Sequence, residues 1–435
     1  MERFALSRMK EWKETENRKP LIIRGARQVG KTWIMKTFGQ QYFEKTAYVN
    51  FDNNARMKQV FEGDLDIERL VLAISAETGV SIEAESTLII FDEIQEVPKA
   101  LTSLKYFYEN APQYAIVAAG SLLGVALHQG TSFPVGKVDF LDLYPLNFRE
   151  FLCEMGEKQF VSMLDSCDTQ MVTVFKTKYI ERLREYYFVG GMPEVVKDFS
   201  EKKDYNRVRV IQKNLINYYQ QDFSKHAEIK LVPRLNLVWN SIPMQLAKEN
   251  KKYIYGQVRE GSRAKDFELA IQWLLDCGLI HKVQRIQKPD LPLKAYIDFD
   301  AFKLFLVDIG LLIAMTDLDA KVIIEGNKIF TEFNGSLTEQ YILQQLISDV
   351  GVIPYYYSTQ NSKGEIDFLV QGKTSVIPIE VKAEENLKAK SLKAFCEKYQ
   401  PSYAVRTSMS DYREQDWMTN IPLYAIKWIE NYVNQ

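Results

Sequence analysis

The chain has 435 residues, of which 55 are Lys or Arg and 57 are Asp or Glu, so its formal net charge is −2. At about 100–200 residues per domain, this length predicts two to four domains. With 46% hydrophobic and 26% charged residues, the composition excludes a chain that is disordered, collagen-like or coiled coil throughout. The near-neutral charge excludes nucleic-acid binding by bulk charge alone, although it is compatible with a local basic face.

The numbers and positions of cysteine and histidine residues bear on metal sites and disulfide bonds. The chain has four scattered cysteines without a CxxC pair and three scattered histidines, which argues against a zinc site or a disulfide scaffold. The N-terminus has no apolar signal core, and no run of about 18 apolar residues is present to span a bilayer. These features predict a cytoplasmic protein in a reducing compartment, with no membrane partner.

The first third of the chain alternates short apolar strands with helical stretches. Continuous apolar runs of this kind predict a parallel sheet covered by helices on both faces. A helix is expected to begin over residues 32–38, between the first and second strands. The predicted strands are residues 20–23, 47–51, 88–91 and 114–119.

The segment after the first strand fits the pattern G-x-x-x-x-G-K-[ST]. Glycines let backbone N–H groups approach a phosphate closely, and the N-terminus of the following helix favours the anion. Lys31 is expected to reach the β- and γ-phosphates of a nucleotide, and the Thr32 hydroxyl is expected to hold Mg²⁺. We therefore predict a nucleotide site made of Gly25, Ala26, Arg27, Gln28, Val29, Gly30, Lys31 and Thr32.

Two other strands end in polar residues that suit this site. Asp92 and Glu93 follow the apolar strand 88–91, and parallel strands deliver such residues to the ligand-binding edge of a sheet. Asp92 is expected to hold the magnesium, and Glu93 to polarise the attacking water as general base. Ser121, after the strand 114–119, is either a catalytic residue at the γ-phosphate or a helix N-cap, and both roles are compatible.

These motifs resemble AAA+-type ATPases, in the branch of prokaryotic ATPases close to the STAND NTPases. The resemblance rests on residues 23–32, 91–95 and 119–121, and on the passage 143–151 from strand to helix. It covers roughly the first half of the chain. It implies ATP as the nucleotide, Mg²⁺ as its cation, and hydrolysis of ATP as the reaction.

The resemblance extends to Gly190-Gly191-Met192-Pro193, which is similar to the family's lid motif and implies that Pro193 packs near the nucleotide base. Family members usually carry Arg where this chain has Lys137. Lysine lacks the bidentate fork of arginine and would serve less well as a finger on a neighbouring nucleotide. Whether Arg149, Arg182 or Arg184 takes that role in a homo-oligomer, or is a solvated helix charge, stays open.

The middle of the chain combines short helices with a strand-like end. Predicted helices at 231–246, 255–258 and 265–275, followed by a strand at 279–283, resemble a winged-helix unit. Lys248, Lys251, Lys252, Arg259, Arg263 and Lys265 make the neighbourhood basic. The alternative, which we favour over direct base reading, is a packing module between two domains.

The last hundred residues hold a second group of polar residues. Two strands are predicted at 365–370 and 376–381, joined by a turn at 372–373. Because side chains alternate along a strand, Glu380 and Lys382 share one face, and a hairpin would place Asp367 beside them. Two carboxylates and a lysine on one face suit a hard cation and an activated water.

This arrangement resembles the PD-(D/E)xK superfamily, the fold of restriction-type endonucleases. The resemblance implies Asp367 and Glu380 as Mg²⁺ ligands, Lys382 as the catalytic group that orients water, and Glu339 on the preceding helix as a third metal ligand. The proline that usually precedes the aspartate is replaced by Ile366. Several lineages keep this fold without cleaving, so cleavage stays an open question.

Together these observations predict an α/β chain in four parts: a P-loop NTPase core at 1–147, a helical lid at 148–228, a winged-helix-like connector at 229–290 and a restriction-endonuclease-like domain at 291–435. The expected enzyme is an ATPase whose nucleotide state controls a nuclease-like domain acting on DNA or RNA. The alternative is a regulatory ATPase that binds nucleic acid or a protein partner without cleavage.

Overall fold

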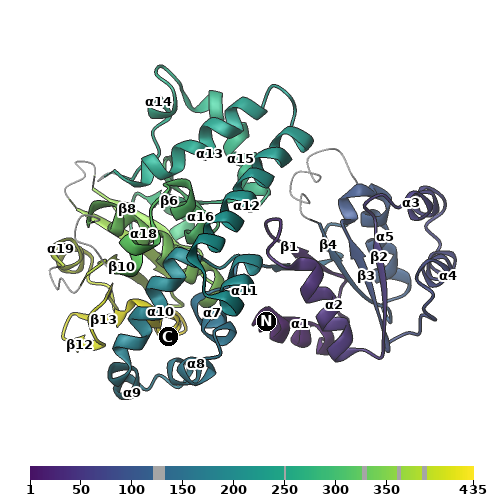
Figure 1. Cartoon of the computed structure of the whole chain (residues 1–435), viewed down its shortest axis with the longest axis horizontal. Coiled ribbons are helices and arrows are strands. Elements are labelled where there is room, and N and C mark those ends of the chain that lie inside the picture. The colour runs from purple at the N-terminus through teal and green to yellow at the C-terminus, as the bar shows by residue number, and fades with distance from the viewer. Residues whose placement is uncertain (121–132, 249–250, 326–330, 360–363, 385–388) are drawn as a thin grey trace. The chain divides into compact units, whose positions relative to one another are not determined.

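The structure is a computed structural model that describes residues 1–120, 133–248, 251–325, 331–359, 364–384 and 389–435 (Figure 1). The chain divides into two compact units. The N-terminal unit comprises Glu2–Tyr144 together with Asp276–Leu279, and the C-terminal unit comprises Met1, Pro145–Leu275 and Ile280–Gln435. Within the described ranges, none of the helices combines the length and the apolarity that a membrane span needs.

A five-stranded parallel sheet forms the centre of the N-terminal unit, as the apolar runs predicted. Its strand order is β2-β3-β4-β1-β5, so β4 lies between the strand before the phosphate loop and the strand that ends at Asp92. The fifth strand was not predicted because its sequence, Asp-Phe-Leu-Asp, is short and half charged. The strands are β1 (Leu21–Arg24), β2 (Lys45–Asn50), β3 (Thr87–Asp92), β4 (Ala115–Ala119) and β5 (Asp139–Asp142).

Helices cover both faces of this sheet, and Figure 1 shows α1 and α2 on one side and α3, α4 and α5 on the other. The second face buries an aromatic cluster in which Phe51, Phe61 and Phe91 meet edge to face, with ring centroids 5.4 to 5.8 Å apart. This buried cluster fixes the strand that carries the predicted acidic residues. The helices are α1 (Ala5–Glu14), α2 (Lys31–Tyr42), α3 (Ala55–Glu62), α4 (Ile67–Thr78), η1 (Ile94–Glu96) and α5 (Pro98–Asn110).

The first half of the C-terminal unit is helical, as predicted. Its first helix begins at a capping box, in which the Asn147 side chain and the Glu150 side chain each bond the other's backbone N–H. The helices are α7 (Phe148–Glu154), α8 (Lys158–Asp165), α9 (Thr169–Val174), α10 (Lys176–Val189), α11 (Pro193–Lys202), α12 (Tyr205–His226), α13 (Val232–Leu246), α14 (Tyr255–Val258), α15 (Ala264–Asp276), α16 (Ile309–Met315) and α17 (Ala320–Ile324).

An eight-stranded mixed sheet forms the rest of this unit, in the order β12-β13-β11-β10-β9-β8-β6-β7. The two strands β6 and β7, in and beyond the predicted connector, belong to the same sheet as the C-terminal hairpin. The strands are β6 (Ile280–Ile286), β7 (Ile297–Leu306), β8 (Tyr355–Ser358), β9 (Glu365–Gln371), β10 (Val376–Val381), β11 (Val405–Ser408), β12 (Arg413–Gln415) and β13 (Met418–Pro422).

Helices pack on this sheet and complete the unit. Leu392 and Phe395 of α19 (Lys390–Tyr399) contribute to an apolar core with Tyr357, Ile366 and Leu369. The long helix α18 (Thr331–Gln345) carries Glu339 and packs against β10. The remaining short elements are η2 (Leu293–Tyr296), η4 (Leu346–Val350), η5 (Leu423–Ile429) and α20 (Glu430–Val433).

Candidate functional site

The predicted phosphate loop connects β1 to α2 in a conformation that only glycine tolerates at two positions. Gly25 has φ +141° and Gly30 has φ +96°. A Cβ atom on Gly25 would lie 2.1 Å from the Leu143 carbonyl oxygen, so no larger residue fits. The backbone path therefore accounts for both glycines of the motif.

Lys31 is buried at the start of α2, and its Nζ donates to the carbonyl oxygens of Gly25 and Ala26 at 2.9 and 2.7 Å. Burial lowers the pKa of Lys31 to about 8, and the carboxylates of Glu93 and Asp92 oppose this shift. A lysine ammonium held inside the loop by backbone oxygens is placed where a nucleotide phosphate would be bound.

The predicted cation-binding pair is brought together. The Thr32 hydroxyl donates to Asp92 Oδ2 at 2.6 Å, and the Tyr48 hydroxyl donates to the same oxygen at 2.9 Å. Burial and the Asp92 carboxylate raise the pKa of Tyr48, so the tyrosine remains a donor. A hydroxyl and a carboxylate are the hard oxygen ligands that suit Mg²⁺. Tyr48 was not predicted, although it lies on the strand that pairs with β3.

Glu93 lies next to this pair. Its backbone N–H donates to Asp92 Oδ1 at 3.1 Å, and its side chain accepts from Gln95 Nε2 at 2.6 Å. Its φ of +50° is uncommon for a residue other than glycine, and such strained residues often occur at functional sites. The structure thus places the predicted general base beside the predicted magnesium ligand, with an amide that orients it.

Two further segments of the N-terminal unit adjoin the phosphate loop. Arg3 is buried, and its guanidinium donates to the carbonyl oxygens of Val29 at 2.9 Å and Tyr144 at 2.6 Å. The turn Asp276–Leu279 belongs to the same unit, and a Cβ atom on Gly278 would lie 3.1 Å from the Ala26 nitrogen. Sequence reasoning missed both contacts because each joins residues that are distant in the chain.

Two other residues predicted for the nucleotide site are not among the described residues of the N-terminal unit. Ser121 lies outside the described residues. Pro193 is the first residue of α11 in the C-terminal unit. The glycines before it have packing roles there: a Cβ on Gly190 would lie 2.2 Å from Asp308 Oδ1, and one on Gly191 would lie 2.1 Å from the Leu146 oxygen. These close approaches explain the two glycines without a nucleotide.

Asp308 is the buried partner of this Gly-Gly turn. Its Oδ2 accepts from Gly191 N at 2.6 Å, and its Oδ1 accepts from Leu311 N at 3.1 Å. Burial raises its pKa to about 6, against the effect of these hydrogen bonds. Asp308 therefore fixes the Gly-Gly turn to the start of α16.

The basic residues considered as fingers are engaged within their own units. Lys137 forms an ion pair with Glu109 at 3.0 Å, and Arg149 forms one with Asp349 at 2.8 Å. Arg182 forms an ion pair with Glu157 at 2.7 Å. Arg184 donates to the Ile324 carbonyl oxygen at 3.4 Å. These contacts favour structural roles.

The predicted winged-helix region has the expected order of elements, three helices and then two antiparallel strands: α13, α14, α15, β6 and β7. The exposed side chains of α15 are Lys265, Glu268, Leu269 and Gln272, a face without net positive charge. Such a face does not suit insertion into a DNA groove, where phosphates require positive charge. The geometry therefore favours the packing role.

In the C-terminal unit, the predicted ligand Glu339 lies in a buried ion-pair network. It pairs with Lys251, and its Oε2 lies 3.6 Å from Lys303 Nζ. Lys303 is fully buried on β7 and also pairs with Glu365. Burial acts to lower the pKa of Lys303, but the charges of Glu339, Glu365 and Asp367 outweigh it and raise that pKa. Lys303 therefore remains a cation.

Asp367 belongs to the same network, and its burial favours the neutral form. Burial raises its pKa to about 8, and the Glu339 charge adds to this shift. For Glu339, burial acts to raise the pKa, but the Lys251 and Lys303 charges and a hydrogen bond with Asp367 outweigh it and lower the pKa. In this structure the formal charges of Glu339 and Glu365 balance those of Lys251 and Lys303.

Glu380 and Lys382 form a separate pair, with Glu380 Oε1 and Lys382 Nζ 2.7 Å apart as the strand alternation predicted. The second oxygen, Glu380 Oε2, accepts from Leu392 N of α19 at 3.1 Å. The hairpin does bring Asp367 next to β10, since Asp367 Oδ2 accepts from Val381 N at 2.7 Å. Across the described ranges, no group of three or more His, Cys, Asp or Glu residues is arranged to hold a metal ion.

These observations give different answers for the two predicted magnesium sites. The phosphate-loop residues fit the cation, because a hydroxyl and a carboxylate lie together beside Lys31. The C-terminal residues Glu339, Asp367 and Glu380 do not fit a divalent cation as the structure arranges them. Lys251 and Lys303 neutralise the charge of Glu339. Both oxygens of Glu380 are already bound, one to Lys382 and the other to the backbone of α19.

Three family models match parts of the chain. Residues 17–152 match the model described as an AAA domain. Residues 180–322 and 334–426 match two models that are each described as a domain of unknown function, DUF8612 and DUF4143. A comparison with curated proteins gives no match. The AAA match confirms the predicted P-loop ATPase fold of the N-terminal unit and supports ATP binding and hydrolysis there.

Solved structures show distant likeness only. The Walker-type ATPase PABY2304 of Pyrococcus abyssi is 15% identical with a TM-score of 0.44, over 72% of this chain and 95% of that chain. The Aeropyrum pernix Orc1 protein in complex with DNA is 13% identical with a TM-score of 0.27, over 72% and 91%. Cdc6p from Pyrobaculum aerophilum is 10% identical with a TM-score of 0.24, over 74% and 93%.

Proposed function

We propose that this protein is a regulatory ATPase whose nucleotide state controls a C-terminal unit that binds nucleic acid or a protein partner without cutting it. The observation that carries the second half of this proposal is the neutral Lys251–Glu339–Lys303–Glu365 network. Charged groups in a low-dielectric interior need compensation, and here the lysines provide it. A metal ion would add positive charge to a cluster that is already balanced.

In the N-terminal unit, Lys31 binds the β- and γ-phosphates of ATP, and Glu93 orients the water that attacks the terminal phosphate. Mg²⁺, held by Thr32 and Asp92, would neutralise charge on the phosphates. Tyr48 and Thr32 both donate to Asp92 Oδ2 and hold this carboxylate in place. Gln95 donates a hydrogen bond to Glu93, which limits the orientations of this general base. Ser121, which lies outside the described residues, is included in this proposal as a catalytic residue.

The experiment is steady-state ATP hydrolysis by the wild type, Glu93→Gln and Lys31→Ala. We expect Glu93→Gln to bind ATP with near wild-type affinity while kcat falls at least about 100-fold, the lower range for loss of a general base. Lys31→Ala should lose ATP binding itself. If Glu93→Gln hydrolyses ATP at the wild-type rate, Glu93 is not the base.

A Mg²⁺-dependent nuclease is the second candidate, because the C-terminal elements have the order expected of that fold. Helix α18 is followed by the strands β8, β9 and β10, then by α19 and β11, and the four strands are adjacent in the sheet. Pairing is antiparallel from β8 to β10 and parallel between β10 and β11. Cleavage would require Lys251 to leave Glu339, so a Lys251→Ala variant that cuts DNA where the wild type does not would favour this candidate.

A further inference from the structure

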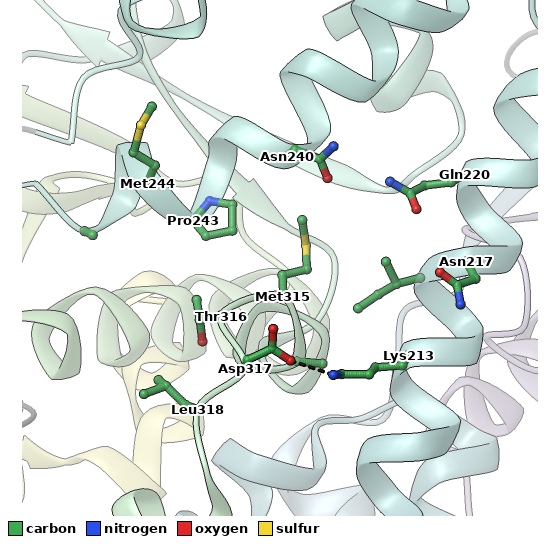
Figure 2. Close-up of a pocket in the computed structure, with 13 residues that line it drawn as sticks. Lys213, Asn217, Gln220, Asn240, Pro243, Met244, Met315, Thr316, Asp317 and Leu318 are labelled. Carbon is green, nitrogen blue, oxygen red and sulfur yellow. Dashed lines mark ion pairs between the residues drawn. The ribbon is translucent and has the colours of Figure 1, made fainter.

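A pocket of about 770 Å³ lies in the C-terminal unit, and none of its lining residues belongs to the two predicted magnesium sites. Figure 2 shows its walls: one face of α12, one face of α13, and the end of α16 with the residues that follow it. Pro243 lies inside α13 and forms part of the wall. Because a proline inside a helix removes a hydrogen bond and bends the helix, it gives a reason for the gap beside α12.

The floor of the pocket is apolar and made partly of flexible side chains. Ile216, Pro243, Met244 and Met315 line it, and Met315 lies between the two helices in Figure 2. The volume falls within the 300–1,000 Å³ or so that is usual for small-molecule sites, which are lined mostly by apolar groups. The thioethers of Met244 and Met315 are polarisable and make favourable contacts with aromatic rings.

Three carboxamides surround this floor: Asn217 and Gln220 from α12 and Asn240 from α13. In Figure 2 the side chains of Gln220 and Asn240 point toward one another from the two helices. None of the three makes a hydrogen bond or an ion pair within the described part of the chain. Covering them with a purely apolar ligand would leave several polar groups without partners, which is costly.

The charges at the pocket cancel. Lys213 and Asp317 form an ion pair at 2.6 Å, drawn as the dashed line in Figure 2. A pocket with one cation that is already paired has no excess charge to select a polyvalent anion, and its single carboxylate does not suit a metal ion. The site therefore favours a ligand with a neutral, hydrogen-bonding edge.

We propose that this pocket binds a nucleobase, with the ring on the Met315 and Pro243 surface and its edge on the carboxamides of Asn217, Gln220 and Asn240. A carboxamide offers a donor and an acceptor side by side, which matches the paired acceptor and donor on a base edge, as in Asn or Gln bound to adenine. The base can come from a free nucleoside or from an unstacked position in single-stranded nucleic acid. This site is independent of the ATP site and of whether the C-terminal unit cleaves.

The test uses the full chain with Lys31→Ala, so that the phosphate loop does not contribute. Adenosine, guanosine, cytidine and uridine are titrated by calorimetry, alongside a short single-stranded oligonucleotide and its abasic counterpart. The pocket variant is Gln220→Met, which keeps the side-chain length and removes the carboxamide. The matched control is Gln221→Met, the next residue of α12, which is exposed and does not line the pocket.

We expect at least one nucleoside, or the oligonucleotide but not its abasic form, to bind about tenfold more weakly to Gln220→Met than to Gln221→Met. A nucleoside response identifies a free ligand, whereas a response from the oligonucleotide alone identifies a base in a strand. The proposal is overturned if no base-containing probe binds, or if binding is equal in the two variants. Because Gln220 is only half-buried, both variants are expected to fold, and their circular dichroism would show it.

Discussion

Replacing Lys303 by methionine removes the central cation of the carboxylate network and keeps a side chain of similar length. Lys303 is 0% exposed, with its Nζ 3.6 Å from Glu339 Oε2 and in an ion pair with Glu365. Removing one partner of a buried pair costs about 3–5 kcal/mol, because the remaining charge is left without compensation. An exposed pair contributes about 0–1 kcal/mol. We therefore expect Lys303→Met to destabilise the C-terminal unit by about 3–5 kcal/mol.

The assay is urea unfolding of the full chain, in which hydrogen exchange of peptides from α18, the helix that carries Glu339, reports on the C-terminal unit. The control is Lys288→Met, since Lys288 pairs with Asp290 on the surface with its side chain 61% exposed. The double variant Lys303→Met with Glu339→Gln should recover part of the loss, because it removes the unpaired charge. A Lys303→Met chain that loses less than about 1 kcal/mol would refute the argument that a buried lysine compensates these carboxylates.

Three further predictions concern single residues. Because burial lowers the pKa of Lys31 to about 8 and ATP binding needs its ammonium, ATP affinity measured by calorimetry should fall as pH rises above about 8; a flat profile from pH 7 to 9.5 would contradict this. Arg3→Ala removes the hydrogen bond to the Val29 carbonyl of the phosphate loop and the hydrogen bond that ties the same guanidinium to Tyr144, and ATP affinity should fall about tenfold while Arg8→Ala leaves it unchanged. Asp367 keeps its proton up to about pH 8 in the folded state but only up to about pH 3.8 in the unfolded state, so its contribution to stability is complete below pH 3.8 and is lost as pH rises through 8. Asp367→Asn should therefore reduce the fall in the free energy of unfolding between pH 4 and 8. An unchanged slope of that free energy against pH would argue against a neutral Asp367.

The N-terminal site was largely predictable, because its chemistry is local in sequence. The phosphate loop and the two carboxylates at the end of β3 each lie in a run of consecutive residues. The parallel sheet brings the ends of β1 and β3 to the same edge, where Thr32 at the start of α2 meets Asp92. Arg3 and Tyr48 could not be assigned, since a single arginine or tyrosine carries no pattern and each reaches the site only through the fold.

The C-terminal hairpin was also predictable, because the alternation of apolar and polar residues fixes which side chains share a face. Strand β10 covers the predicted residues 376–381, and Glu380 and Lys382 pair as expected. What the sequence could not reveal is Lys303, a lysine inside the apolar strand β7, or Lys251, which comes from before α14. Both reach Glu339 from elsewhere in the chain, and they change the chemistry that the carboxylates suggested.

The central claim is an ATPase whose C-terminal unit binds without cutting, and an endpoint cleavage assay tests it most directly. Supercoiled plasmid, linear duplex, single-stranded DNA and RNA would be incubated with Mg²⁺ or Mn²⁺, with and without ATP, using a preparation that hydrolyses ATP. We predict that every substrate stays intact with the wild type. Cutting by the wild type that is lost in Glu380→Ala would contradict the account and establish a nuclease site, and its loss in Lys31→Ala as well would show that the nucleotide controls it.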